Sequence, residues 1–244
     1  MLMVAATLTS CTTFISYNQA PTTYSLAIET TDSVMGLCTI YYSLEVQCGK
    51  YALIAILSYD EFDEPEFAGP EVTLSEGRYK RKGPKYYLHD AGLGYQMVLC
   101  RHGKNLYVEQ SFPFLIGKTL NYEGKDESCY SWLMSPKHLS ICRTWEYPLD
   151  SDANLIALHN GIYRSNFLMP STIEFGNDGG YRYSIIDHLL SEGTWTRDGN
   201  YLTLQDTVLH YAIEAAIVDS TIITKAIPAS RYKNLIFRYD HRNR

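Results

Sequence analysis

The chain lacks any apolar run that approaches the ~18 residues of a membrane-spanning helix, which excludes an internal transmembrane helix. It also lacks a surplus of positive charge: 21 Lys and Arg residues stand against 27 Asp and Glu residues, and the formal net charge is -6. A general surface for polyanions is therefore excluded, and nucleic-acid binding would need a local basic stripe. We expect no nucleic-acid partner.

Several motifs that carry chemistry are absent as well. The sequence contains no Cys-x-x-Cys, no His-Glu-x-x-His and no Gly-x-Ser-x-Gly, so it shows no redox pair, zinc ribbon, metalloprotease helix or nucleophile elbow. Its six cysteines are scattered. Their spacing is compatible with a Cys129–Cys142 disulfide and with buried unpaired cysteines, of which the second is the commoner outcome. We predict no catalytic residue, metal or cofactor.

What the sequence does contain favours β-structure. Hydrophobic residues make up 45 %, enough to bury a core, and 21 tyrosines suit the pleated surface of a sheet. Short alternating segments recur between glycine-containing turns, as in residues 171–175 and 181–186 around the turn at 177–180. Strands at this spacing indicate an antiparallel barrel or sandwich. Residues 211–218 have a helical composition, but their alternation favours a strand.

An internal repeat divides the chain. Residues 74–95 and 190–211 align without gaps at an offset of 116, with ten of 22 positions identical. Upstream, Gly49-Lys50-Tyr51 matches Gly161-Ile162-Tyr163 after a four-residue shift. Self-similarity at the spacing of a domain indicates duplication rather than a short solenoid repeat.

We therefore predict an all-β protein with two related antiparallel meander barrels or sandwiches. The expected layout comprises a lipoprotein-type signal peptide, a tether with the first strand, a first β domain, a connector and a second β domain. The corresponding residues are 1–10, 11–36, 37–122, 123–152 and 153–240.

The N-terminal residues Leu8-Thr9-Ser10-Cys11 resemble the lipobox of bacterial lipoproteins. This resemblance implies cleavage before Cys11, acylation of its thiol with palmitate or a similar chain, and a membrane anchor. The sequence departs from the family because no Lys or Arg precedes Glu29, whereas a signal peptide begins with a basic region. The alternative is that residues 2–8 form a buried strand beside a packed Cys11.

A second resemblance concerns the repeat. Gly161-Ile162-Tyr163, Ser191-Glu192-Gly193-Thr194-Trp195 and the segment 199–204 resemble the lipocalin-like meander barrels of bacterial envelope lipoproteins, including the copper-response (NlpE-type) domain. The resemblance covers residues 159–206 well and 49–95 more weakly. It implies a lipocalin-like barrel and an address at the outer membrane or cell surface. That family carries a Cys-x-x-Cys near its first strand, which is absent here, so metal sensing is not carried over.

The repeated Ser-Glu-Gly-aromatic motif supplies the candidate site residues. Either its carboxylates bind a ligand or act as acid and base, or the glycine permits a bend or bulge while the aromatic ring fills the core. We favour the structural interpretation, because the motif occurs twice and is mostly turn-forming. The residues are Glu76, Gly77 and Tyr79 in the first copy and Glu192, Gly193 and Trp195 in the second.

Two charged runs complete the candidates. Residues 60–66 are rich in carboxylates that could hold Ca²⁺, but the glycine of a calcium loop is missing, which favours a solvated loop. Residues 78–85 are basic and could contact phosphate or anionic lipid headgroups. For this basic run we favour a position facing the acidic run across adjacent strands.

These observations predict a non-enzymatic lipoprotein of the bacterial cell envelope with a binding or structural role. The expected partners are a membrane, held through the lipid anchor, and a small apolar ligand or an envelope protein. Two alternatives stay open. One is a secreted or surface hydrolase on the same β scaffold, and the other is a secreted binding protein without the lipid.

Overall fold

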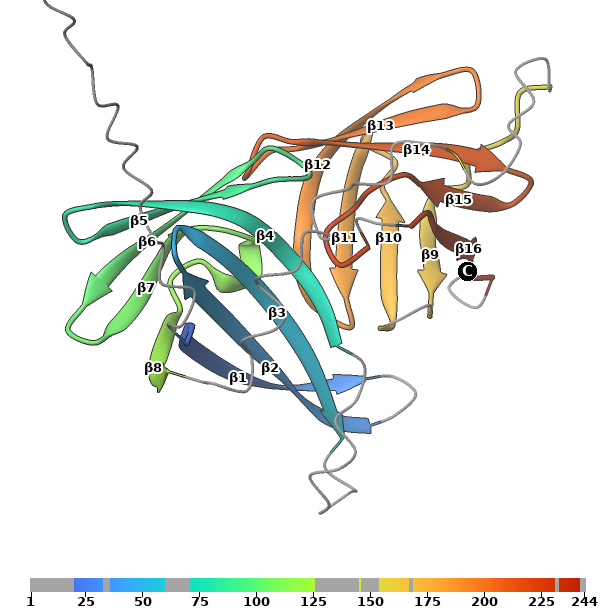
Figure 1. Ribbon diagram of the computed structural model, residues 1–244. Coiled ribbons are helices and arrows are strands. Elements are labelled where there is room, and N and C mark those ends of the chain that lie inside the picture. The colour runs from blue at the N-terminus through green and yellow to red at the C-terminus, as the bar shows by residue number, and fades with distance from the viewer. Residues whose placement is uncertain are drawn as a thin grey trace, which may run out of the picture.

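Two closed barrels make up the protein in the computed structural model (Figure 1). The structure describes residues 20–32, 36–59, 71–125, 145, 154–166, 169–230 and 233–241. Each barrel has eight strands, and every strand is antiparallel to both neighbours in an up-and-down order. The predicted all-β class with two related antiparallel barrels is thus confirmed.

The first barrel closes where its first strand pairs with its eighth. Its strands are β1 (Thr22–Asp32), β2 (Gly36–Gln47), β3 (Lys50–Tyr59), β4 (Glu71–Lys82), β5 (Lys85–Asp90), β6 (Gln96–His102), β7 (Asn105–Gln110) and β8 (Thr119–Lys125). A single 3-10 turn, η1 (Pro113–Leu115), lies between β7 and β8. The first strand, expected within 11–36, is an integral part of this barrel.

The second barrel closes between its first and last strands, where Tyr239 pairs with Tyr163. Its strands are β9 (Gly161–Ser165), β10 (Ser171–Phe175), β11 (Gly180–Ile185), β12 (His188–Asp198), β13 (Tyr201–Asp206), β14 (Ala212–Val218), β15 (Thr221–Thr224) and β16 (Leu235–Tyr239). Among the described residues, no helix has the length and apolar character needed to cross a bilayer.

Tyrosine fills the barrel interiors. Along a strand such as β13, exposed and buried residues alternate strictly, because successive side chains point to opposite faces of the sheet. Inward positions carry large side chains that are almost wholly buried, among them Tyr42, Tyr51, Tyr163 and Tyr183. The rings of these four tyrosines pack like core side chains, while their hydroxyls find hydrogen-bond partners.

The offset of 116 relates β4–β8 to β12–β16 throughout. Upstream of β4 the predicted alignment of Tyr51 with Tyr163 is wrong. Tyr51 lies opposite Gly77 and Tyr181 lies opposite Gly193, so Tyr51 corresponds to Tyr181. The first barrel has longer strands and different connections in this part, with 12 residues in β2 against five in β10, and the spacing is therefore not preserved.

The barrels meet end to end. An up-and-down barrel places alternate turns at the same end. The β5–β6 turn, which contains Tyr95, contacts the β13–β14 turn, which contains Tyr211, and η1 lies against β12. We call these the inner ends. The opposite, outer ends carry the β2–β3, β4–β5 and β6–β7 turns of the first barrel and the corresponding turns of the second, at opposite extremes of the molecule (Figure 1).

Candidate functional site

The repeated motif forms a buried hydrogen-bond network. In the first barrel, Ser75 Oγ donates to Asp90 Oδ2 at 2.9 Å and lies 2.7 Å from the Tyr51 hydroxyl. The other carboxylate oxygen of Asp90 accepts the backbone N–H groups of Gly92 at 2.8 Å and Leu93 at 2.6 Å. Asp90 is only 4 % exposed. A buried carboxylate in this position ties three strands to the following turn, because each of its oxygens is hydrogen-bonded.

The second barrel repeats this network. Ser191 Oγ donates to Asp206 Oδ2 at 2.7 Å and lies 2.7 Å from the Tyr181 hydroxyl. Asp206 Oδ1 accepts from the backbone N–H of Val208 at 2.9 Å. Burial raises the pKa of Tyr181 above its ordinary value of 10.0, so this hydroxyl stays protonated. The serine and aspartate were visible as identities in the sequence repeat, but nothing in the spacing showed that they bond to each other.

Gly77 and Gly193 lie where two backbones come too close for a side chain. A Cβ atom at Gly77 would lie 2.0 Å from the carbonyl oxygen of His89, and one at Gly193 would lie 2.0 Å from that of Gln205. The glycine of the motif therefore permits close approach of the neighbouring strand.

A bulge lies three residues before each glycine, and not at the glycine itself. In the first barrel Leu53 lies opposite Ser75 and Ile54 opposite Thr73, so that Leu74 is the extra residue. The register of β11 against β12 shifts at the corresponding place. A bulge bends its strand and strengthens the local twist, which is what closing a small barrel requires.

The other motif residues have different surroundings in the two copies. Glu76 is 5 % exposed, whereas the side chain of Glu192 is 43 % exposed. Tyr79 and Trp195 both pack against the core but stay partly exposed, and the Trp195 ring meets Phe175 edge to face at 6.0 Å. Because the two glutamates do not share an environment, the motif does not define one repeated ligand or acid–base site.

An open groove on the second barrel contains the exposed copy of the motif. It has a volume of about 510 Å³, and Glu174, Arg182, Glu192 and Thr194 are among its lining residues. Glu174 lies opposite Arg182 in the sheet, and Arg182 lies opposite Glu192, with 3.9 Å between Arg182 Nε and Glu192 Oε2. Arg182 thus forms an ion pair with Glu192 and lies beside Glu174 in the sheet. A cation next to the carboxylates favours polar recognition over acid–base catalysis.

The contact between the barrels was not predicted. Tyr95 and Tyr211 occupy the same position in the repeat, both are buried, and their ring centroids lie 4.9 Å apart. Contact between equivalent residues is the signature of a two-fold axis. The two barrels are therefore related by a pseudo-two-fold axis that passes close to this tyrosine pair.

On one side of the axis, polar and aromatic groups join the barrels. His188 stacks on Phe114 with a centroid distance of 5.3 Å, and its Nδ1 is hydrogen-bonded to the Tyr42 hydroxyl. Beside it, Thr30 Oγ1 donates to the Asp187 carboxylate. These bonds link β1 and β2 of the first barrel to the start of β12 in the second.

Burial lowers the pKa of His188 below its ordinary value of 6.5. The Asp187 carboxylate opposes this effect, with its Oδ1 atom 3.8 Å from His188 Nε2, while Lys118 adds to it. The imidazole is thus neutral at neutral pH, as its place against two aromatic rings requires.

The equivalent positions across the axis are filled differently. At the offset of 116, Phe114 and His188 correspond to Ser230 and Val72, which line one small cavity together with Met169 and Ser171. Its volume of about 10 Å³ holds about one water molecule. The same junction is therefore joined by side-chain hydrogen bonds on one side of the axis and contains a small cavity on the other.

The expectation that the basic run 78–85 faces the acidic run across adjacent strands is wrong. The strands bonded to β4 are β3 and β5. Opposite Arg78 they carry Lys50 and His89, and opposite Lys82 they carry Lys85. The acidic run follows β3 at the other end of the strand, and its own residues lie outside the described part of the chain.

Within the described ranges, no group of three or more His, Cys, Asp or Glu residues is placed to hold a metal ion. The three cysteines that the structure describes, Cys38, Cys48 and Cys100, form no disulfide. The predicted lipidation site Cys11 and the Cys129–Cys142 pair lie outside the described residues.

The chain was compared with known proteins, and no family model, curated protein or solved structure matches it. The resemblance to envelope lipoproteins stays a prediction from sequence motifs. The functional assignment depends on the residues and their geometry.

Proposed function

We propose that the protein is a lipid-anchored, non-enzymatic binding or structural protein of the bacterial cell envelope. The observation that carries the proposal is the order of features at the N-terminus. The lipobox-like sequence ends at Cys11, and the first barrel strand begins at Thr22. Eleven residues span at most about 36–40 Å, so an acyl chain on Cys11 would hold the first barrel close to a membrane surface.

The role of the motif residues supports binding over catalysis. The polar groups that occur in both copies, Ser75 with Asp90 and Ser191 with Asp206, are bonded to one another and to the backbone. They stabilise the turns and leave the outer surfaces for recognition. The hydrolase alternative has less support, because the glutamates of the groove, Glu174 and Glu192, both flank Arg182.

The partner proposed for this protein is a membrane or an envelope protein at the outer membrane or cell surface. The barrel interiors are filled by large side chains, including Tyr42, Tyr51 and Phe237. A small apolar ligand inside a barrel would have to displace such rings. Recognition on the outside of the barrels therefore has better support.

Cell fractionation tests the anchor. The full chain is expressed in a bacterial host from its natural start, beside a Cys11→Ser variant. We expect the natural chain in the membrane fraction after a high-salt wash, and the variant in the soluble fraction. If both chains fractionate alike after that wash, the lipid anchor is contradicted.

A further inference from the structure

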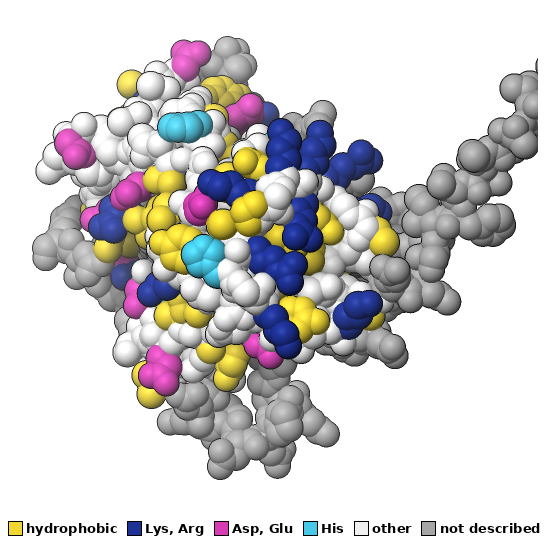
Figure 2. Space-filling view, turned by 90° about the vertical axis from the view of Figure 1, so that its left-hand side faces the viewer, with side chains coloured by type: hydrophobic (Ala, Val, Ile, Leu, Met, Phe, Trp, Pro, Cys, Tyr) yellow, Lys and Arg dark blue, Asp and Glu magenta, His cyan; other side chains and the backbone are white. Residues whose placement is uncertain are grey.

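Cations gather at the outer end of the first barrel. Exposed Lys and Arg residues occupy the three turns of this end and the last residue of β8. They are Lys50, Arg81, Lys82, Arg101, Lys104 and Lys125. We call this surface the basic end. Figure 2 views the molecule from this side and shows Lys and Arg side chains grouped together, with hydrophobic side chains between them.

Few carboxylates neutralise the basic end. Among the described residues, the salt bridge that reaches it joins Lys85 Nζ to Glu109 Oε2 at 2.5 Å. The residues opposite Lys80 and Lys82 on β5 are Tyr87 and Lys85, so the cations face a ring and another cation. Side chains of like charge on neighbouring strands repel one another, and anions bound to this surface would reduce that repulsion.

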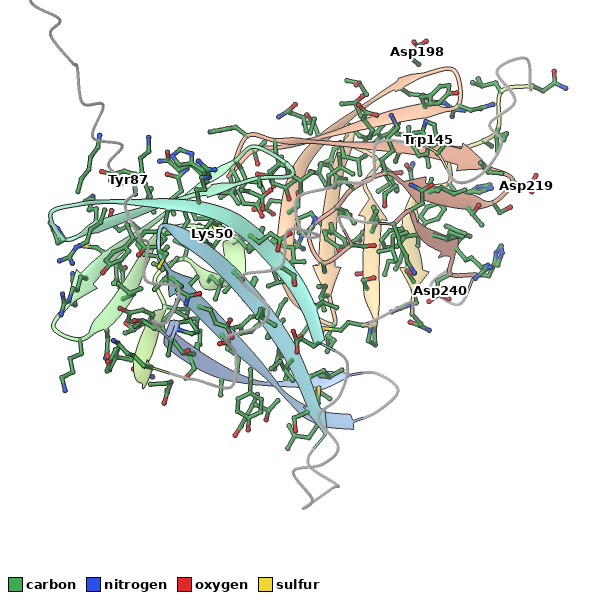
Figure 3. All side chains as sticks on the ribbon, viewed as in Figure 1. Lys50, Tyr87, Trp145, Asp198, Asp219 and Asp240 are labelled. Atoms are coloured by element: carbon green, nitrogen blue, oxygen red, sulfur yellow. The ribbon has the colours of Figure 1, made fainter. Side chains whose placement is uncertain are left out.

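Tyrosine rings lie among these cations. The Arg81 guanidinium lies 5.5 Å from the centroid of Tyr86, and Lys82 Nζ lies 5.8 Å from that of Tyr87. Tyr122 on β8 is 40 % exposed. Lys50 and Tyr87 both lie in the first barrel, on the side away from the second (Figure 3). Tyrosine favours the boundary between lipid headgroups and water, since its ring is apolar and its hydroxyl is polar.

The second barrel shows that the fold does not require this charge. Its outer end has the same three turns, and they carry Asp178, Asp198 and Asp219. Asp198 and Asp219 lie at the far side of the molecule from Lys50 (Figure 3). Arg197, the equivalent of Arg81, also lies at this end, so the second outer end carries cations and carboxylates together, whereas cations predominate at the first. This difference defines a preferred orientation on a charged surface.

The chain enters the first barrel at the basic end. Thr22 lies opposite Val46, beside the β2–β3 turn, and opposite Lys125 on its other side. Thr22 is eleven positions after Cys11, and a chain of that length reaches at most about 36–40 Å. An acyl chain on Cys11 would therefore hold the basic end, and not the outer end of the second barrel, next to the lipid.

We infer that the basic end is a docking surface for the anionic headgroups of the membrane in which the protein is anchored. The inference depends on the proposed function, since the lipid anchor selects a membrane over other polyanions. A cluster of Lys and Arg residues beside an acyl chain provides the second attachment that stable membrane binding needs. Docking in this way directs the outer end of the second barrel away from the membrane.

Vesicle co-sedimentation of the full chain tests the surface without the anchor. All proteins carry Cys11→Ser, and the vesicles contain either phosphatidylglycerol with phosphatidylethanolamine or phosphatidylcholine alone. We expect binding to the anionic vesicles that weakens as salt is raised, and little binding to phosphatidylcholine. The double variant Lys82→Gln/Lys104→Gln should partition about tenfold or more weakly onto the anionic vesicles.

The matched control is Lys233→Gln/Arg238→Gln, which removes the same charge from two exposed positions of the second barrel and should bind as the parent does. All of these changes are at surface side chains, and circular dichroism verifies the fold. Equal binding to both vesicle types, or equal loss in both double variants, would overturn the docking surface. So would a DNA duplex that binds the parent more tightly than the anionic vesicles at the same salt concentration. Because no acyl chain is present, a failure here leaves the fractionation result for the anchor unaffected.

Discussion

Asp90 and Asp206 show how the repeat stabilises the protein at the level of single residues. Each is a buried carboxylate that accepts one serine hydroxyl and backbone N–H groups of the next turn. Such charge-assisted bonds are stronger than neutral ones, and the loss of one acceptor leaves buried donors without a partner. The recurrence of these two aspartates is therefore explained by the turns that they stabilise.

Replacing either aspartate by asparagine should destabilise the protein by about 3 kcal/mol, since an amide keeps the shape but loses the charge and one acceptor. Urea unfolding followed by circular dichroism measures the change. Glu192→Gln, at an exposed position of the same motif, should stay within about 0.5 kcal/mol of the parent. Similar values for Asp206→Asn and Glu192→Gln would contradict the structural role of the network.

The glycines permit a second test at this scale. Gly193→Ala would place a Cβ atom 2.0 Å from the Gln205 carbonyl oxygen, so that β12 and β13 must separate. We expect a loss of more than about 3 kcal/mol or failure to fold. Gly83→Ala is the control, because its Cβ atom would meet open space and it costs only about 1 kcal/mol through its positive φ. Urea unfolding of the two variants measures both losses of stability. A loss in Gly193→Ala no larger than that in Gly83→Ala would contradict the close approach of β12 and β13.

At the level of elements, β12 connects the two barrels. Its first residue, His188, is held neutral between Phe114 and Tyr42. The folded protein binds a proton at this imidazole less readily than the unfolded chain does. The contribution of this imidazole to the free energy of unfolding should therefore be fully present above pH 6.5. It should be lost as the pH falls below that value toward the lower pKa of the folded state.

The substitution His188→Val isolates this effect, because Val72 is the natural residue at the equivalent position. We expect the variant to lose part of the decline in stability between pH 7 and pH 5, although it is less stable than the parent at pH 7 through the lost bond to Tyr42. Urea unfolding at several pH values measures both effects. An unchanged slope in His188→Val would contradict a buried neutral imidazole at the junction.

At the level of the whole molecule, the pseudo-two-fold junction makes one body of two barrels. Tyr95 buries its ring against Tyr211 of the other barrel. Calorimetry should therefore show one cooperative transition for the natural chain. Tyr95→Ala should cost about 3–5 kcal/mol and separate the transition into two, whereas Tyr201→Ala, at a surface position, should change little. Two resolved transitions in the natural chain would mean that the junction does not couple the barrels.

Much of this architecture could be predicted from local patterns. The alternation around residues 171–186 predicts a hairpin, and the identities between 74–95 and 190–211 predict two related domains; both predictions are confirmed. The match of Tyr51 to Tyr163 was wrong because the strands upstream of the repeated segments 74–95 and 190–211 differ in length. The bonds from Tyr42 to His188 and from Thr30 to Asp187 join residues about 150 positions apart, and such contacts have no local pattern.

The candidate site was predictable to a smaller extent. Glu76, Gly77, Glu192 and Gly193 were found because they recur, but a repeat cannot tell a turn from a binding site. Part of the basic end was visible in the sequence, since Arg81 and Lys82 belong to the basic run 78–85 that could contact lipid headgroups. The whole surface was not visible, because it also includes residues of other hairpins such as Lys50 and Lys104. Only the closed barrel brings them to one end.

The lipid anchor at Cys11 is the claim on which the cellular role depends most. The intact mass of the protein, purified from a bacterial host that expresses the natural start, tests it most directly. We predict a chain that has lost the residues before Cys11 and has gained the mass of acyl groups. An unmodified chain that still begins at Met1 would contradict the account.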